Sequence, residues 1–416
     1  MNIGYACLCV GVPNTAFKSC TIKNAFEETL REIIKHNLKM LSNIIDYNIE
    51  NKIKLFRISS DIIPFGSSPV NSLNWREEFK NELTELGEKI KSGNIRVSMH
   101  PGQYTVLNSP DNEVVNRSVD DLEYHCGFLD ALGVDFQNKI VLHVGGSYGD
   151  KESAEGRFIE NFSFLRKNIK KRLVLENDER SFNICDVLRI SSKILIPVIF
   201  DNLHNEVNPC LEEAADIFWI KKARETWKGE DGVQKVHYSQ QNKDKKKGAH
   251  SKTINLTEFL KFVENIAFDE IDIMLEVKDK NLSALKCMNA ISSNRHIKSL
   301  EKEWGKYKYN ILEKAPDIYS QIRNLLKNKE EYPVVEFYQL VDKAMGNSSV
   351  KGNEINAALH VWGYFSEYYE EKYIWEKKLD SFEKGKISAQ ILKKHLWMLT
   401  EKYNQEYLKK SYYFWL

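Results

Sequence analysis

The sequence predicts an α/β protein, namely a (β/α)8 (TIM) barrel over residues 1–292 followed by a separate all-α domain over residues 293–416. Short apolar runs alternate with amphipathic segments eight times before about residue 292, which matches the strand count and size of such a barrel. Beyond that point the alternation stops, and long helical patterns rich in Lys, Glu, Tyr and Trp take over. An open, doubly wound sheet remains the alternative fold for the first part.

The expected strands are near-continuous apolar runs, as is typical of strands buried on both faces of a parallel sheet. In order, they are residues 3–10, 53–60, 95–100, 139–146, 172–178, 196–204, 233–239 and 271–279. Segments such as 24–49 and 74–93 carry apolar residues at helical spacing between these runs, which predicts helices that cover the sheet. In the C-terminal part, aromatic residues at helical spacing, as in HVWGYFSEYY, indicate a helical core.

Composition places the chain among globular proteins, with 42% hydrophobic and 29% charged residues. The sequence contains neither an apolar stretch of the roughly 20 residues that cross a membrane nor a basic leader. The seven scattered cysteines predict free thiols in the cytoplasm, and the Cys7-x-Cys9 pair lacks a partner pair for structural zinc. Because the net charge is only +1, any contact with nucleic acid is expected to be local.

Histidines and charged residues stand at the carboxyl ends of consecutive expected strands, where a barrel of this kind builds its active site. They are His100, His143, Glu176, Asp201 with His204, Lys235 with His237, and Glu276, and His250 follows in the loop after the seventh strand. Charged groups inside a barrel are unfavourable unless they are paired or bind metal. Imidazole and carboxylate without thiolate suit Mn²⁺, Zn²⁺ or Fe²⁺, and this many ligands suffices for two or three ions.

A multi-metal cluster of this type is suited to hydrolysis of phosphoesters, because divalent cations activate water and stabilise charge on the attacking and leaving oxygens. Lys235 and His237 are two residues apart on one strand, so both side chains point to the same face. A cation beside divalent metals is unfavourable. Lys235 is therefore expected to be neutral, turned aside, or converted to a carbamate that itself binds metal.

With these residues in place, the chain resembles the UV-damage endonucleases, a branch of the metal-dependent barrel group that includes apurinic endonucleases and xylose isomerases. The resemblance rests on GYAC, FRISSDIIP, MHPGQYTVLNSP, LHVGGSYGDK, LENDE, FDNLHN, KVHYS and LEVKDK, which span residues 1–290. It implies two or three divalent ions, Mn²⁺ foremost with Zn²⁺ or Mg²⁺ as alternatives, and no organic cofactor. The implied metal ligands are His100, His143, Glu176, Asp201, His204, His237, His250 and Glu276. It also implies that Lys235 is the carboxylated lysine and acts in catalysis with Glu176 and Glu276.

The resemblance further implies that Gln103 and Tyr104 probe the duplex and fill the gap left when two damaged pyrimidines turn out. Damaged bases stack poorly, so their extrusion is less unfavourable, and an aromatic ring replaces the lost stacking. Tyr5 matches a tyrosine that lines the lesion pocket. Cys9 stands where the family often has an asparagine, and a thiol cannot replace an amide's paired donor and acceptor.

Two further segments have a basic or aromatic character. Residues 242–252, NKDKKKGAHSK, place a lysine run before His250, which is either a solvated loop or a site for DNA phosphates. From about residue 305 the chain resembles a YbgA-type helical domain through HVWGYF, FEKGKISAQILKKHL and YLKKSYYF, and this resemblance implies no function.

The leading hypothesis is therefore a DNA-repair endonuclease that nicks duplex DNA immediately 5′ of a UV photoproduct, leaving a 3′-hydroxyl and a 5′-phosphate. An apurinic-site endonuclease is expected to have an Asp-x-His pair where this chain has Gly248 and Ala249 before His250. A sugar isomerase would need a closed pocket for a polyol, and the Gln-Tyr pair beside a lysine-rich loop argues against it. A fourth hypothesis, a helical binding module on an inactive barrel, conflicts with the intact ligand set. The sequence leaves the oligomeric state open.

Overall fold

The structure, a computed structural model, describes residues 1–211, 214–266 and 270–416. Within these residues there are eight strands, one in each of the eight predicted runs, and only β1 extends beyond its run, by the one residue Asn2. They are β1 (Asn2–Ala6), β2 (Leu55–Arg57), β3 (Arg96–Ser98), β4 (Ile140–His143), β5 (Leu173–Glu176), β6 (Val198–Asp201), β7 (Lys235–Tyr238) and β8 (Asp272–Leu275). The strands are shorter than the runs because apolar residues continue into the turns that follow.

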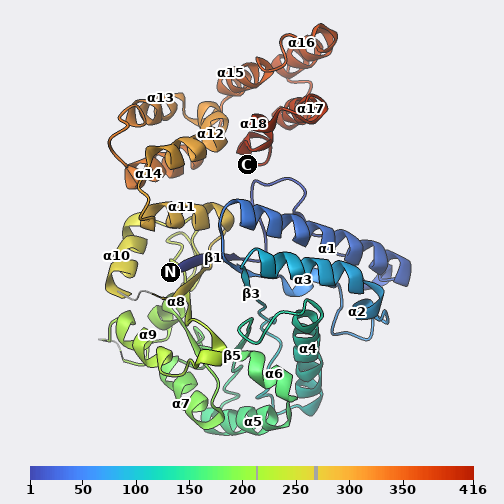
Figure 1. The fold of residues 1–416 in the computed structure, drawn as a ribbon, viewed down its shortest axis with the longest axis vertical. Coiled ribbons are helices and arrows are strands. Elements are labelled where there is room, and N and C mark those ends of the chain that lie inside the picture. Colours follow the sequence, from blue (N-terminus) through green and yellow to red (C-terminus); the bar gives the residue numbers. More distant parts are fainter. Residues whose placement is uncertain (212–213, 267–269) are drawn as a thin grey trace. The chain divides into compact units, whose positions relative to one another are not determined.

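All strand pairs are parallel, in the order β3-β2-β1-β8-β7-β6-β5-β4. The two edge strands meet at a parallel bridge between Met99 and Ile140. There Met99 N donates to Lys139 O at 3.0 Å, and Val141 N donates to Met99 O at 2.9 Å. The predicted barrel is confirmed, and the open sheet is wrong because its edge strands would not pair with each other (Figure 1).

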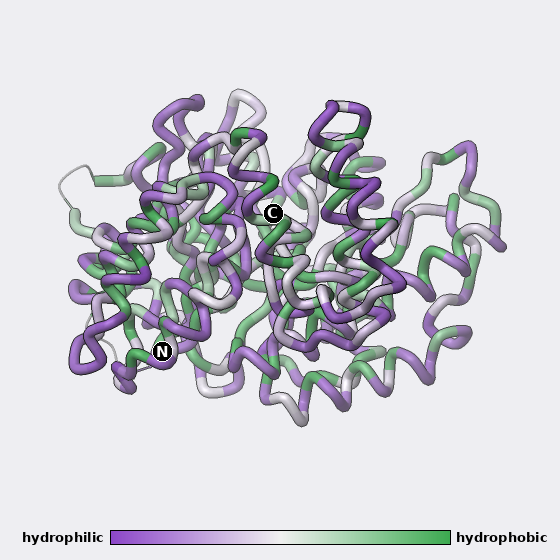
Figure 2. The backbone as a smooth tube through the Cα atoms, turned by 90° about the horizontal axis from the view of Figure 1, so that it is seen from above, coloured by the Kyte–Doolittle hydropathy of each residue, from purple (hydrophilic) through white to green (hydrophobic). Residues whose placement is uncertain are grey.

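Helices connect the strands and surround the barrel (Figure 1). They are α1 (Glu27–Glu50), α2 (Trp75–Glu78), α3 (Lys80–Ser92), α4 (Asn112–Ala131), α5 (Lys151–Phe164), α6 (Lys167–Arg172), α7 (Ile184–Ile194), α8 (Asn202–Val207), α9 (Asp216–Arg224), α10 (Leu256–Ile266) and α11 (Asn281–Ile291), with 3-10 turns η1 (Ile22–Asn24), η2 (Ser60–Ile62) and η3 (Gly229–Asp231). Hydrophilic and hydrophobic residues alternate along the helices, as expected for helices with one buried face (Figure 2). The helix predicted over 74–93 is interrupted at Phe79, between α2 and α3.

Apolar side chains fill the barrel interior toward the amino ends of the strands, and polar side chains fill it at their carboxyl ends. Val141, Val174 and Ile199 form one interior cluster. Two residues further along each strand, the pleat brings the next side chain to the same face. Thus His143 on β4 and Glu176 on β5, which are register partners, both follow the apolar layer into the interior.

The chain divides into two compact units. The first contains residues 1–9, 14–254 and 261–285, and the second contains 10–13, 255–260 and 286–416. The division falls inside α11, seven residues before the predicted end of the barrel domain at 292. The amino-acid composition of the chain changes only after α11, whereas the residues that pack against α11 already change within the helix.

The second unit is predominantly helical, in agreement with the predicted all-α region. Its helices are α12 (Ile297–Lys314), α13 (Pro316–Leu325), α14 (Val334–Met345), α15 (Lys351–Trp362), α16 (Tyr369–Glu383), α17 (Ala389–Lys402) and α18 (Glu406–Lys409), followed by η4 (Tyr412–Phe414). The core includes Phe365, Trp375 and Leu396, and the rings of Trp362 and Trp375 stack with centroids 4.9 Å apart.

Cysteine pairing differs from the expectation of free thiols. Cys185 at the start of α7 and Cys210 after α8 form a disulfide, with Cα atoms 5.9 Å apart. The other five cysteines, all in described positions, form no disulfide. The sequence did not reveal the pair, because its members lie 25 residues apart and only folding brings them together. None of the helices in the described ranges has the length and apolar character needed to cross a membrane.

Candidate metal centre

Glu176, at the end of β5, is fully buried and lies among imidazoles from other strand ends. Its Oε2 lies 3.1 Å from His100 Nε2 and 3.5 Å from His143 Nε2. Its Oε1 lies 2.6 Å from His237 Nδ1 and 3.8 Å from His204 Nδ1. These contacts arise because the carboxyl ends of all parallel strands meet at one end of the barrel.

Glu276, directly after β8, is the second carboxylate of the cluster. Its Oε1 lies 3.3 Å from His237 Nδ1, and its Oε2 lies 3.8 Å from His250 Nε2. It also accepts a 2.5 Å hydrogen bond from Arg57 Nη1. Burial alone would raise the pKa of the Glu276 carboxyl, but the Arg57 guanidinium holds it below its ordinary value. Arg57 was not predicted as a site residue, although an arginine inside an apolar strand was a detectable signal.

Asp201 is the last residue of β6, and His204 lies in the first turn of α8, which follows directly. Asp201 caps the helix, since its Oδ1 accepts a 2.8 Å hydrogen bond from the His204 backbone N–H. His204 Nδ1 lies 3.9 Å from the same oxygen and 2.9 Å from the backbone oxygen of Asn177. His204 Nε2 lies 3.8 Å from Glu179, a carboxylate in the LENDE segment that the sequence analysis did not select.

Ligand atoms of these residues are close enough to share cations. Three groups in the described part of the chain each have ligand atoms within 4.8 Å of one another, and Glu176 belongs to all three. The groups are His100–His143–Glu176, Glu176–Asp201–His204 and Glu176–His237–Glu276. The fold thus brings seven of the eight predicted ligands together, and His250 approaches them through Glu276.

Buried polar atoms without partners indicate what the cluster is suited to bind. Among the described residues, His143 Nδ1, Asp201 Oδ2 and His237 Nε2 are buried and have no hydrogen-bond partner. A buried polar atom left unpaired is unfavourable by about 1–3 kcal/mol. These nitrogen and oxygen atoms can coordinate a metal ion, and they lie beside two carboxylates. The residues therefore fit divalent cations of the Mn²⁺ or Zn²⁺ type.

The titration behaviour of the cluster reflects its crowding. Burial disfavours the Glu176 carboxylate, but His237 and its neighbours hold the pKa of this group well below its ordinary value. Burial lowers the pKa of His100 to about 4 despite the contact with Glu176. Burial also opposes charge on His204, yet Asp201 and Glu176 raise its pKa to about 10. Burial and neighbouring charges therefore shift the pKa values of these groups in opposite directions within one cluster.

Lys235 begins β7 and points into the barrel two residues below His237. The side chain is fully buried, and its Nζ makes no hydrogen bond to any described residue. Burial, aided by the positive charge of Arg96, lowers the pKa of the amine well below its ordinary value. Of the three expected states, a turned-aside cation is therefore the least compatible with this environment.

Residues 100–105 form an exposed loop at the same end of the barrel. It starts at the predicted ligand His100, turns where Thr105 N donates to Gly102 O, and presents Gln103 and Tyr104 to solvent. Tyr104 is 70% exposed. A Cβ atom on Gly102 would lie only 2.5 Å from the Tyr104 ring, so a larger residue here would displace this exposed ring.

Helix α4 anchors both ends of this loop through buried polar groups. Thr105 Oγ1 donates a 2.6 Å hydrogen bond to Asp121 Oδ2. Ser60 Oγ donates to the His100 backbone oxygen at 2.6 Å, and His125 Nε2 lies 3.0 Å from the same hydroxyl. These anchors were not predicted, because residues with polar side chains on an amphipathic helix normally face solvent.

Tyr5 does not join the exposed residues. It points to the outer face of β1, is fully buried, and donates a 2.8 Å hydrogen bond to Asn48 of α1. Its neighbours in the strand, Gly4 and Ala6, take the interior positions. Strand alternation turns the Tyr5 ring toward this helix, and the expectation that Tyr5 lines a lesion pocket stays a prediction.

The lysine run of residues 243–247 forms the tip of a hairpin that carries His250 at its base. Gln241 and His250 form an antiparallel bridge, and Asn242 N donates to Ala249 O at 2.7 Å. The four lysines of this segment are exposed, and they are Lys243, Lys245, Lys246 and Lys247. The hairpin thus joins these lysines to His250, which contacts Glu276 of the imidazole–carboxylate cluster.

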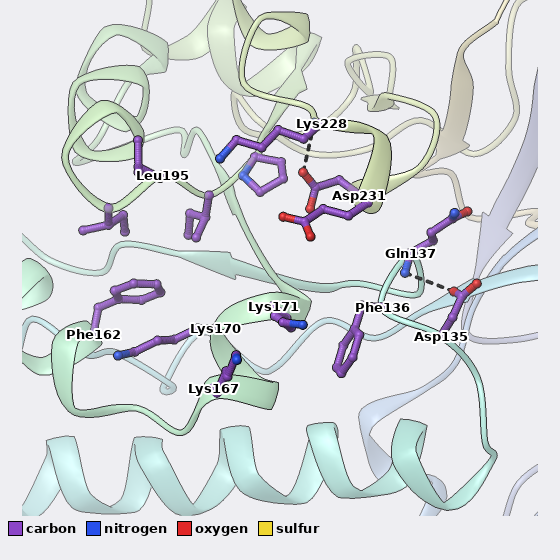
Figure 3. A pocket seen from close by; sticks show the side chains of 14 residues that line it. Asp135, Phe136, Gln137, Phe162, Lys167, Lys170, Lys171, Leu195, Lys228 and Asp231 are labelled. Atoms are coloured by element: carbon purple, nitrogen blue, oxygen red, sulfur yellow. Dashed lines mark hydrogen bonds between the residues drawn. The ribbon is translucent and has the colours of Figure 1, made fainter.

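A separate hollow of about 410 Å³ lies at the opposite end of the barrel (Figure 3). Its walls come from segments that precede β4 to β7, and they include Phe136, Lys171, Leu195 and Lys228. Because parallel strands begin there, this hollow is separated from the imidazole–carboxylate cluster by the length of the strands.

Comparisons with known proteins agree with this geometry. A family model described as UV-endonuclease UvdE matches residues 1–308, and one described as a protein of unknown function (DUF1722) matches residues 308–416. The chain is 45% identical to the UV DNA damage endonuclease of Clostridium perfringens (strain 13 / Type A) over 353 residues, 83% of each chain. It is 36% identical to that of Bacillus cereus (strain 03BB102) over 289 residues, 69% of this chain and 90% of the relative.

The crystal structure of SacUVDE superposes with a TM-score of 0.65 at 42% identity, covering 69% of this chain and 96% of that one. The barrel, its cluster of imidazoles and carboxylates, and the sequence similarity thus lead to one conclusion. The chain belongs to the UV-endonuclease UvdE family.

Proposed function

We propose that this enzyme is a DNA-repair endonuclease that hydrolyses the phosphodiester immediately 5′ of a UV photoproduct in duplex DNA. One observation carries the proposal: the exposed pair Gln103–Tyr104 begins three residues after the predicted ligand His100, whose ring contacts the buried Glu176. A probe inserted into the duplex is therefore attached directly to the cluster that would act on the backbone. The names of the relatives support UV-damaged DNA as the substrate.

The proposed metal site uses the eight predicted ligands, with Glu176 and Glu276 as the central carboxylates. Divalent cations there, Mn²⁺ in our proposal, would supply Lewis acidity toward the phosphodiester and acidify a water molecule. The protein contributes the orientation of the ligands. Arg57 holds Glu276, and the Asn177 backbone oxygen holds His204 Nδ1, so that Nε2 remains available as the ligand atom.

Lys235 is proposed to carry a carbamate. A neutral amine attacks carbon dioxide, forms an N–C bond, and releases one proton, which leaves a carboxylate on the side chain. Two observations support this: the amine is fully buried, and its Nζ has no partner among the described residues. The resulting anion would lie below His237 and add an oxygen ligand to the cluster.

Lesion recognition is assigned to Gln103 and Tyr104, and backbone contacts to the lysine hairpin. Photoproducts pair and stack poorly, so the Tyr104 ring can take the place of the extruded bases. Lysines at the hairpin tip would neutralise phosphates near the cluster, with an affinity that falls as salt rises. Tyr5 has no assigned contact with DNA in this proposal.

A nicking assay tests the proposal on three duplexes of one sequence: with a single cyclobutane pyrimidine dimer, with an abasic site, and without damage. We expect cleavage 5′ of the dimer with 3′-hydroxyl and 5′-phosphate ends, lost on chelation and restored by Mn²⁺. Preferential cleavage of the abasic duplex would instead indicate an apurinic endonuclease. Undiminished cleavage after complete metal removal would contradict the metal-dependent mechanism.

A further inference from the structure

The second unit contains two adjoining hollows that the metal centre does not use. One, of about 430 Å³, is lined by Ile391, Lys394, Trp397 and Trp415 together with four further residues. The other, of about 570 Å³, lies between α16 and α17. Both hollows include Ile391 and Lys394, so together they form one continuous surface. Each has a volume suited to a nucleotide-sized group.

The aromatic hollow presents rings that pack edge-on against one another. Trp397 on α17 contacts Trp415 near the end of the chain, with ring centroids 5.0 Å apart, and contacts Phe414 at 5.2 Å. Trp415 remains 42% exposed. Its ring is held by its neighbours, so a flat ligand group can pack on it without first having to order it.

The hollow between α16 and α17 combines exposed apolar side chains with cations. Ile374, Ile391 and Met398 are 45%, 45% and 57% exposed, which is unusual for side chains that lie together on one face. Lys378 on α16 and Lys394 on α17 line the same hollow. An exposed apolar patch rimmed by polar residues marks an interaction site.

Charge at this surface is not fully compensated within the protein. Lys393 pairs with Glu313 and Lys402 pairs with Glu371, at 2.6 and 2.5 Å. In the described ranges, Lys378 and Lys394 form no such ion pair. Two cations that face one hollow from two helices therefore remain available to an anion.

A buried imidazole provides a further, independent observation. His395 lines the hollow between the helices, is only 7% exposed, and its Nε2 makes no hydrogen bond to any described residue. An unpaired buried nitrogen is unfavourable. A polar ligand that reaches the floor of this hollow would satisfy it.

We propose that this surface, defined by Lys378, Lys394, His395, Trp397 and Trp415, binds single-stranded DNA. Phosphate would lie between the lysines and His395, and a neighbouring base would stack on Trp415. Cations beside aromatic rings are what sequence-tolerant single-strand binding uses, whereas a duplex hides the base faces that the tryptophan needs. The choice of DNA rests on the proposed function, because the same chain would then act on DNA at its barrel.

The test measures fluorescence anisotropy of a labelled 12-nucleotide oligo(dT) with the full chain at several salt concentrations. Trp415→Ala is expected to weaken binding roughly tenfold through loss of one stacked base. The double variant Lys378→Ala/Lys394→Ala is expected to reduce the log–log salt slope by about 1.4, at about 0.7 for each phosphate of a single strand.

Matched controls for these variants lie on α16, outside both hollows. Lys372→Ala/Lys377→Ala removes the same charge, and Tyr369→Ala removes an aromatic ring that is 83% exposed. Both controls should bind oligo(dT) like the parent protein. Equal losses in controls and test variants, or no loss in the test variants, would overturn the proposal.

Two further measurements separate this site from the barrel and from another type of partner. Trp415→Ala should keep nicking of a short dimer-containing duplex. If the parent nicks no duplex but oligo(dT) binding still depends on Trp415, the proposed function fails and this inference survives. Binding of an acidic, leucine-containing peptide in place of oligo(dT) would show a protein-docking surface and refute the inference.

Discussion

At the scale of single residues, the metal centre is organised around Glu176. One carboxylate contacts four imidazoles, which is possible only because each oxygen serves two of them. The same crowding leaves ring nitrogens such as His237 Nε2 without partners in the described structure. Tyr104 represents the opposite case, an aromatic side chain that the fold leaves in solvent.

Replacement of Tyr104 by alanine should reduce cleavage of a dimer-containing duplex by roughly 10- to 100-fold, the range expected for one lost base-stacking contact. Metal content should not change, because the side chain contacts no ligand atom of the cluster. The measurement compares nicking rates with bound metal determined by elemental analysis. Phe164→Ala, at a 78% exposed aromatic residue at the end of α5, serves as the control. Retained discrimination between damaged and undamaged duplex in Tyr104→Ala would remove the ring from recognition.

At the scale of elements, α4 connects the candidate metal centre to the loop of residues 100–105, which carries the proposed probe pair Gln103 and Tyr104. Asp121 holds the far end of the loop through Thr105, and His125 holds the near end through Ser60 and the His100 backbone. Asp121 and His125 are four residues apart, so they lie on the same face of the helix. Helix and loop therefore position Gln103 and Tyr104 as one unit.

This arrangement predicts a difference between two substitutions at one position. Thr105→Val keeps the shape but leaves the buried Asp121 without its donor, at a cost of about 1–3 kcal/mol in the free energy of unfolding. Thr105→Ser keeps the hydroxyl and should behave like the parent. We expect Thr105→Val to lower the preference for damaged over undamaged duplex while metal content stays constant. Equal selectivity of the two variants, measured well below their unfolding midpoints, would show that the hydrogen bond serves stability alone.

At the scale of the whole molecule, few contacts close the barrel. Among the described residues, buried polar atoms without hydrogen-bond partners lie at the carboxyl ends of its strands. The β3–β4 seam consists of one bridge at Met99 and Ile140. Cations at the cluster would bind the folded barrel and not the unfolded chain. Metal binding should therefore add to the free energy of unfolding of the first unit.

Metal removal consequently has a predicted effect on stability as well as on activity. After chelation, the thermal unfolding midpoint should fall by several degrees, since roughly 3 kcal/mol is gained from a ligand at a hundred times its dissociation constant. Addition of Mn²⁺ should restore both the midpoint and nicking. The measurement is circular dichroism with and without metal, and Glu160→Gln at an exposed carboxylate provides a control. An identical midpoint in both states would mean that the ions do not bind at the buried cluster.

The sequence by itself determined the barrel and the candidate ligands, because both depend on local patterns. Eight apolar runs with helical spacing between them allow few other folds, and a parallel arrangement brings every strand's carboxyl end to one side. His100, His143 and Glu176 could therefore be selected one strand at a time. The probe role of Gln103 and Tyr104 came only from the family resemblance of the stretch PGQY and stays a prediction.

Only the tertiary structure decided which residues support that cluster, because support comes from side chains far apart in the chain. Arg57 meets Glu276 across 219 residues, and Cys185 meets Cys210 only when α7 and the segment after α8 are folded. Tyr5 illustrates the converse, since one step of strand alternation places a motif residue on the outer face. Pattern determines where a strand ends, whereas packing in three dimensions determines what each side chain touches.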